Sequence, residues 1–226
     1  MSKNKAFTLI ETLLAMTIIG VISAAVALQL QKIEADQIKV SFGNCYSQLV
    51  SVIKEMYNDE TIYPKIPTGK KTATGQPEFL GFCNGYTNGV SAAPYTKFNK
   101  LFSENIAADD ISTSDEYTYI DSRNNSYWNL SGYMLYSSDC STVANAYIII
   151  VFDVNGLSKG PNCPYTGKFK SDNTFNTVTT TNCKNPDTFW FKIKADGTIV
   201  YDTNKYYDGK DLETYLKDNH FLDSNK

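Results

Sequence analysis

This sequence of 226 residues lacks the spacings of side chains that are typical of catalytic and transition-metal sites. There is one histidine, His220, and no C-x-x-C pair. A zinc site, a Ser-His-Asp triad and a Cys-His pair are therefore not expected. The sequence also lacks the G-x-x-x-x-G-K-[ST] loop that binds nucleotide phosphates. We expect no enzyme activity and no cofactor.

One segment has the beginning of a calcium-binding pattern. Asp153 and Asn155 stand at the D-x-N-G spacing of a calcium loop, but the later acidic ligand of an EF-hand is missing. A plain turn is therefore favoured over a metal site. A tethered hydrolase that uses Asp153 is a still weaker alternative.

Five cysteines indicate an oxidising compartment. The odd number leaves one thiol unpaired or bonded to another molecule. Cys163 and Cys183 flank a polar insertion rich in Thr and Asn, which favours them as a pair, and Cys45 with Cys83 is a second candidate. Sequence alone does not determine the connectivity.

The run from Phe7 to Leu30 contains a single charge, Glu11, and no proline. As a helix, these 24 residues reach roughly 36 Å, and a bilayer core is about 30 Å thick. A carboxylate at the centre of such a span costs on the order of 2.5 to 3.5 kcal/mol, and less toward the interface. Glu11 is either an acid tolerated at headgroup depth or one that is paired with a cation.

The order Lys3, Lys5, Ala6 and then Phe7-Thr8-Leu9-Ile10-Glu11 resembles the N-terminus of type IV pilins and pseudopilins. The resemblance implies that a prepilin peptidase cuts between Ala6 and Phe7 and that the new amine of Phe7 is methylated. The family usually has Gly before the cut, and Ala6 is a small residue that fits a pocket shaped for Gly. A proline that many members carry near the position of Leu28 is absent here.

Cleavage would make Glu11 the fifth residue of the mature chain and create a positive charge on Phe7. In a staggered bundle, the amine of a neighbouring subunit would lie close to Glu11, so that the pair neutralises the acid and sets the register. The partners implied are a prepilin peptidase and methylase, other pilin subunits in a homo- or hetero-oligomeric filament, and the inner membrane.

The expected organisation is a basic leader at 1–6, a transmembrane or filament-core helix at 7–30 and an exported head at 31–226. The basic leader should stay in the cytoplasm. The precursor is thus expected in the bacterial inner membrane, and the mature subunit in a periplasmic or cell-surface filament. Conventional signal-peptidase cleavage near Ala25 is a minor alternative, because the apolar run is too long for an ordinary signal peptide.

The net charge of −3, which becomes −5 without Lys3 and Lys5, argues against nucleic-acid binding across the head. After the apolar run, an apolar stripe recurs every three or four residues and predicts that the helix continues to about Asn58. The stripe consists of Ile38, Phe42, Cys45, Leu49, Val52 or Ile53, and Met56.

Residues 60–130 have the composition of a long connecting region, with a short helix plausible at 95–106. Later segments rich in β-branched and aromatic residues predict strands at 132–136, 146–153, 188–194 and 198–202. The segment 153–162, DVNGLSKGPN, resembles a loop common in the heads of pseudopilins and minor pilins. The expected fold is α+β and pilin-like, with a long N-terminal helix, membrane-spanning in its first half, packed on an antiparallel sheet of about four strands.

The favoured function is a structural subunit, a minor pilin or pseudopilin, of a type IV pilus or a type II secretion-like filament. The alternative is a single-pass, membrane-anchored binding module whose N-terminal helix is not cleaved and whose Tyr-rich head binds a ligand.

Overall fold

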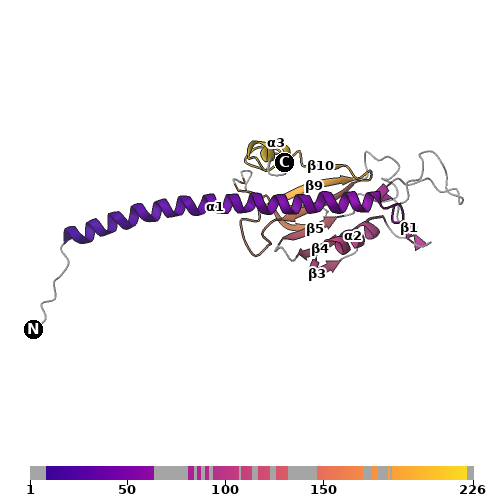
Figure 1. The fold of residues 1–226 in the computed structure, drawn as a ribbon, viewed down its shortest axis with the longest axis horizontal. Coiled ribbons are helices and arrows are strands. Elements are labelled where there is room, and N and C mark those ends of the chain that lie inside the picture. Colours follow the sequence, from indigo (N-terminus) through magenta and orange to yellow (C-terminus); the bar gives the residue numbers. More distant parts are fainter. Residues whose placement is uncertain are drawn as a thin grey trace, which may run out of the picture. The chain divides into compact units, whose positions relative to one another are not determined.

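The chain forms two compact units, residues 1–40 and 41–226, and the long helix α1, Leu9–Asn58, runs through both of them (Figure 1). This computed structural model describes a subset of the residues: 9–63, 81–83, 86–87, 90–91, 94–106, 108–113, 117–122, 126–131, 147–169, 175–177, 183 and 185–222.

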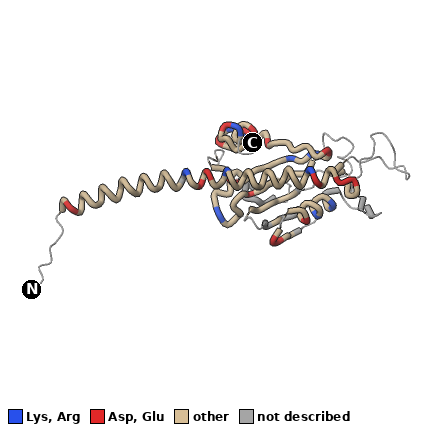
Figure 2. Tube along the Cα trace, in the orientation of Figure 1, with Lys and Arg blue, Asp and Glu red and all other residues tan. Residues whose placement is uncertain are grey.

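From Thr12 to Leu30, α1 contains no charged residue and no proline. Figure 2 shows this part as a long uncharged stretch that follows the acidic start of the helix. The hydroxyls of two threonines in this stretch are satisfied by the helix itself. Thr12 donates to the carbonyl of Leu9 at 2.9 Å, and Thr17 donates to that of Leu14 at 2.8 Å. Neither hydroxyl therefore needs water as a partner.

The second unit is built on an antiparallel sheet. Its strand order is β10-β9-β6-β5-β4-β3, with a pair β1-β2 and a pair β7-β8 outside it. The strands are β1 Tyr86–Thr87, β2 Val90–Ser91, β3 Ala108–Thr113, β4 Tyr117–Ser122, β5 Tyr127–Ser131, β6 Tyr147–Asp153, β7 Tyr165–Phe169, β8 Phe175–Thr177, β9 Thr188–Lys194 and β10 Ile199–Tyr201. The helical elements of this unit, besides the end of α1, are η1 Gly81–Cys83, α2 Pro94–Asn105 and α3 Leu212–Asp218.

The register between β6 and β9 places large apolar side chains opposite one another. Phe152 pairs with Phe189, Ile150 with Phe191, and Ile148 with Ile193, and all six side chains are fully buried. Because successive residues of a strand face opposite sides of the sheet, these six share one face. This face is the centre of the core.

Residues 41–58 of α1 cover that face. Phe42 lies 4.6 Å from Phe189 and 5.8 Å from Phe152, measured between ring centroids. The rest of the buried stripe is Cys45, Leu49, Val52, Ile53 and Met56. The spacing of three and four residues in the sequence thus corresponds to the buried side of the helix.

A row of aromatic rings continues the core beyond the sheet centre. Neighbouring rings lie 4.9 to 5.8 Å apart along Tyr63, Phe82, Phe98, Phe102, Trp128 and Phe152. At one end of this row, Gly81 of η1 packs against the backbone of Ala195. Gly81 has φ +54°, and a Cβ on it would lie 2.0 Å from the carbonyl oxygen of Ala195. Only glycine fits this position.

The α+β class and the long helix on an antiparallel sheet are confirmed. Strands β6, β9 and β10 and the helix α2 lie where the sequence places them. The expectation that 60–130 is a connecting region is wrong, because β3, β4 and β5 come from it and the sheet has six strands. The expected strand at 132–136 lies outside the described residues.

Candidate functional site

Of the three motif residues assigned to processing and assembly, Ala6, Phe7 and Glu11, the structure describes Glu11. Ala6 and Phe7 lie outside the described residues, whereas Glu11 stands in the first turn of α1. A carboxylate at this end of a helix is favoured by the helix dipole, by about 0.3 to 1 kcal/mol. Glu11 is exposed, as are the apolar residues around it.

The apolar stretch of α1 has the properties of a membrane span. It is the single helix in the described part of the chain that is long and apolar enough to cross a bilayer, judged by length and composition. Leu9 is 85% exposed and Val21 is 71% exposed within the chain. This surface needs lipid or other protein around it, because so large an exposed apolar area is unfavourable in water.

A second candidate site lies where β6 ends and β9 begins. Asp153, the last residue of β6, accepts hydrogen bonds on Oδ1 from the backbone amides of Asn155 at 3.1 Å and Gly156 at 2.8 Å. Gly156 has φ +82°, which suits glycine. The D-x-N-G segment therefore folds as a turn held by its own aspartate.

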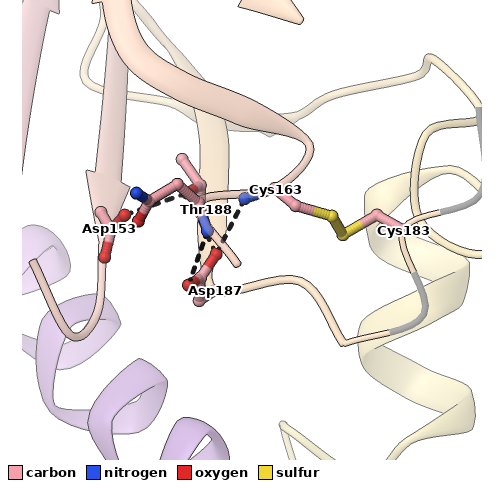
Figure 3. The surroundings of a disulfide bond; sticks show 6 residues. Asp153, Cys163, Cys183, Asp187 and Thr188 are labelled. Atoms are coloured by element: carbon pink, nitrogen blue, oxygen red, sulfur yellow. Dashed lines mark hydrogen bonds between the residues drawn. A yellow bond between two sulfur atoms is a disulfide. The ribbon is translucent and has the colours of Figure 1, made fainter. Parts of the chain in front are cut away.

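Asp187 holds the other end of the same loop. Its Oδ2 accepts from the amide of Asn162 at 3.0 Å, and its Oδ1 accepts from the amide of Cys163 at 2.9 Å. Cys163 is joined to Cys183 by a disulfide bond (Figure 3). Two carboxylates therefore hold the loop 154–163 at the sheet edge, and the disulfide ties its end to the segment around Cys183.

The hydroxyl of Thr188 lies between the two acids, 3.3 Å from Oδ2 of Asp153 and 3.4 Å from Oδ1 of Asp187. Burial, followed by the charge of Asp187, raises the pKa of Asp153 to about 7. Burial also raises the pKa of Asp187, although the amides of Cys163 and Asn162 partly offset the rise. The site therefore favours holding a proton.

Cys45 is a free, buried thiol, so the expectation that it pairs with Cys83 is wrong. Cys83 is disulfide-bonded, but it belongs to η1, whose Gly81 packs beside Tyr57. Tyr57 lies twelve residues beyond Cys45 on α1, roughly 18 Å along the axis. A disulfide needs Cα atoms within about 7 Å, and this separation is too large.

The sequence alone did not identify Asp187 and Thr188 as residues of the candidate site. A signal was present, since Asp153 ends one predicted strand and Asp187 precedes the next. If the two strands are antiparallel neighbours, both acids lie at the same edge of the sheet. In the described ranges, no group of three or more His, Cys, Asp or Glu side chains is arranged to hold a metal ion.

Comparison with known proteins identifies the N-terminal segment. Residues 1–27 match the family model of the prokaryotic N-terminal methylation motif. Searches of curated proteins and of solved structures found no match. The chain thus carries the prepilin-type signature of type IV pilins and pseudopilins, in the segment that includes Ala6, Phe7 and Glu11.

Proposed function

We propose that this chain, which begins with a prepilin-type methylation motif, is a structural subunit of a filament, either a minor pilin or a pseudopilin. The filament is a type IV pilus or a type II secretion-like pseudopilus. The observation that carries the proposal is the motif at 1–27, which includes most of the apolar part of α1.

The proposed life cycle has two stages. In the precursor, residues 1–6 are a cytoplasmic leader, residues 7–30 cross the inner membrane, and the head is exported. A prepilin peptidase then cuts between Ala6 and Phe7, the Phe7 amine is methylated, and the subunit joins other pilin subunits. The disulfide between Cys163 and Cys183 suits an exported head, because such bonds persist in oxidising compartments.

The exposed side chains of α1 give this cycle a physical basis. Fully burying a Leu, Ile or Met side chain is worth about 1.5 to 3 kcal/mol. Lipid supplies that burial for the precursor, and the helices of neighbouring subunits supply it in a filament. Ile10 and Met16, 78% and 74% exposed in the isolated chain, are among the residues that would gain most.

The test is the intact mass of the protein purified from its native host. A mature chain that begins at methylated Phe7 supports the proposal. A chain that retains residues 1–6 in a host with an active prepilin peptidase contradicts it and favours a membrane-anchored binding module.

Two variants of Ala6 make the test specific. Ala6→Leu should accumulate as precursor in the membrane, because a peptidase pocket that accepts Ala has no room for a bulky side chain. Ala6→Gly, the matched control, should be processed at least as well as the natural sequence. Equal processing of both variants would mean that the cut does not fall after residue 6.

A further inference from the structure

The two acids beside Thr188 form a cluster that the N-terminal motif does not explain. Asp153 is 1% exposed, and Asp187 and Thr188 are fully buried. Figure 3 shows the three side chains together, next to the disulfide that anchors the loop. Two ionised carboxylates buried this close to a single hydroxyl would repel each other in a medium that screens charge poorly.

Counting hydrogens shows where a proton fits between the two acids. The Thr188 hydroxyl carries one hydrogen, and it can donate to one carboxylate at a time. Oδ1 of Asp187 also accepts from the amide of Cys163. Oδ2 of Asp153 has Thr188 as its one hydrogen-bond partner among the described residues. With both acids ionised, the hydroxyl donates to Oδ2 of Asp153, and its lone pairs then face Oδ1 of Asp187, which keeps the amide of Cys163 as its donor.

A proton on Oδ2 of Asp153 resolves this conflict. Asp153 then donates to the oxygen of Thr188, and Thr188 donates its own hydrogen to Oδ1 of Asp187. In this chain of hydrogen bonds each donor then meets an acceptor, and the two acids together carry one negative charge in place of two. We propose that Asp153 and Asp187 share one proton through the Thr188 hydroxyl, and that this proton keeps the loop 154–163 closed on the sheet.

Among the described residues, no ion pair supplies a positive charge in place of the proton. From α1, the thiol of Cys45 faces Asp153, and burial raises the pKa of that thiol to about 11, so that it stays neutral at physiological pH. From the segment before β5, Ser126 bonds to Cys45 and does not titrate. None of the ion pairs between described residues involves Asp153 or Asp187.

The proton acts on the loop because the same carboxylates hold both of its ends. Asp153 binds the amides of Asn155 and Gly156, and Asp187 binds those of Asn162 and Cys163. When the proton leaves, repulsion between the acids favours an open loop in which both carboxylates reach water. Closure of the loop and protonation of the pair are therefore linked.

The direction of the pH effect follows from this linkage. An aspartate exposed to water has a pKa of about 3.9, and burial raises that of Asp153 to about 7. Between these two values the closed loop binds one more proton than the open loop. The opening equilibrium therefore rises with pH, by up to about tenfold per pH unit from about pH 4 to about pH 7, and then levels off. The loop is held most tightly in acid.

Infrared difference spectroscopy tests the proton directly on the full-length protein in detergent micelles. Below neutral pH, the natural sequence should show the carbonyl stretch of a buried, protonated carboxylic acid, which disappears with a midpoint near pH 7. Asp153→Asn should abolish this band. A natural protein with no such band at pH 5 to 6, or a band that persists in Asp153→Asn, overturns the assignment.

Hydrogen exchange followed by mass spectrometry tests the loop. After correction for the intrinsic exchange rate, protection of peptides from 154–163 should fall by about 10- to 100-fold between pH 5 and pH 7. In Asp153→Asn, an amide takes the place of the protonated acid, and protection should lose this pH dependence. The matched control is Asp196→Asn, in an exposed turn that the aspartate holds through the amide of Thr198; it should keep the full dependence.

Replacing Thr188 separates the proton chain from simple packing. Thr188→Ser keeps the hydroxyl and should keep the pH midpoint, whereas Thr188→Val removes it and should move the midpoint. Identical midpoints in the Ser and Val variants would show that the hydroxyl does not connect the two acids. A loop whose protection is flat from pH 5 to pH 7 in the natural sequence would overturn the linkage itself.

Discussion

Glu11 is the one charged residue in the apolar stretch of α1, and its place in the first turn of the helix determines what it can meet. The proposed cut would leave a positive amine at Phe7, four residues before this acid. In a filament core, an amine from a neighbouring subunit would neutralise the carboxylate. A charge costs on the order of 2.5 to 3.5 kcal/mol at the centre of a membrane span and less near its end, where Glu11 lies, and the proposed pairing would offset that cost.

Glu11→Gln should therefore leave leader removal and membrane insertion intact, because a less polar helix inserts at least as easily. Filament yield should drop sharply, since the incoming amine meets no carboxylate. The measurement is a count of sheared or imaged filaments from the native host, with cleavage checked by mass.

Glu34→Gln is the matched control, because this exposed acid stands on α1 beyond the apolar stretch. It should leave filament yield close to that of the natural sequence. If Glu11→Gln also assembles normally, Glu11 is a tolerated charge and does not direct assembly.

Phe42 shows how the second part of α1 holds the sheet. Its ring is fully buried against Phe189 and, 5.2 Å away, against Phe221 near the end of the described chain. Phe42→Ala should lower the free energy of unfolding by about 3 to 5 kcal/mol, because it removes apolar burial and leaves a cavity. Urea unfolding of the full-length protein in detergent, followed by tyrosine and tryptophan fluorescence, measures the change.

Val50 provides the comparison on the same helix. It is 37% exposed, so Val50→Ala should change the free energy of unfolding by much less, on the order of 0.5 kcal/mol. Equal losses for Phe42→Ala and Val50→Ala would mean that α1 does not pack on the sheet through the Phe42 side.

Whether a strand could be predicted from the sequence depended on the amino-acid composition of that strand. β6 and β9 are continuous runs of β-branched and aromatic residues, and this makes them recognisable. β3 contains Asp109 and Asp110, and the remainder of β3 and β4 is rich in Thr, Ser and Tyr. Such residues are also common in loops. β3 is stabilised by pairing with β4, and the residues of β3 alone do not reveal this pairing.

The candidate site residues likewise fall into those that the sequence identified and those that it did not. The motif around Phe7 and Glu11 is contiguous in the sequence and was recognised there. The acid pair was missed, because Asp153 and Asp187 come together only through the antiparallel register of β6 and β9. The wrong partner for Cys45 had the same origin, since spacing in the sequence does not show which part of α1 lies beside the segment that contains Cys83.

The second unit has a buried core of its own, which predicts that the head is stable without the apolar helix. A chain that starts at Gln31 should be soluble and should unfold cooperatively under oxidising conditions, because its core residues, from Phe42 to Phe221, all lie in 41–226. Thermal unfolding followed by circular dichroism is the measurement.

A matched chain that starts at Gln48 sharpens this test. It lacks Phe42 and Cys45 and should aggregate or melt without a sharp transition, since the apolar face of β6 and β9 is then partly uncovered. If the chain that starts at Gln31 behaves no better, residues 41–58 do not complete the core as described.

The contact between Phe42 and Phe221 also has a consequence for the nascent chain. A ribosome makes Phe42 early, whereas its ring partners Phe152, Phe189 and Phe221 follow much later. The strands β3 to β6 can pair as they emerge, because each lies beside its predecessor in the sheet. The apolar side of α1 remains uncovered until β9 and the C-terminal segment arrive. Throughout translation, therefore, this side of the helix is a binding surface for chaperones that hold unfolded chains.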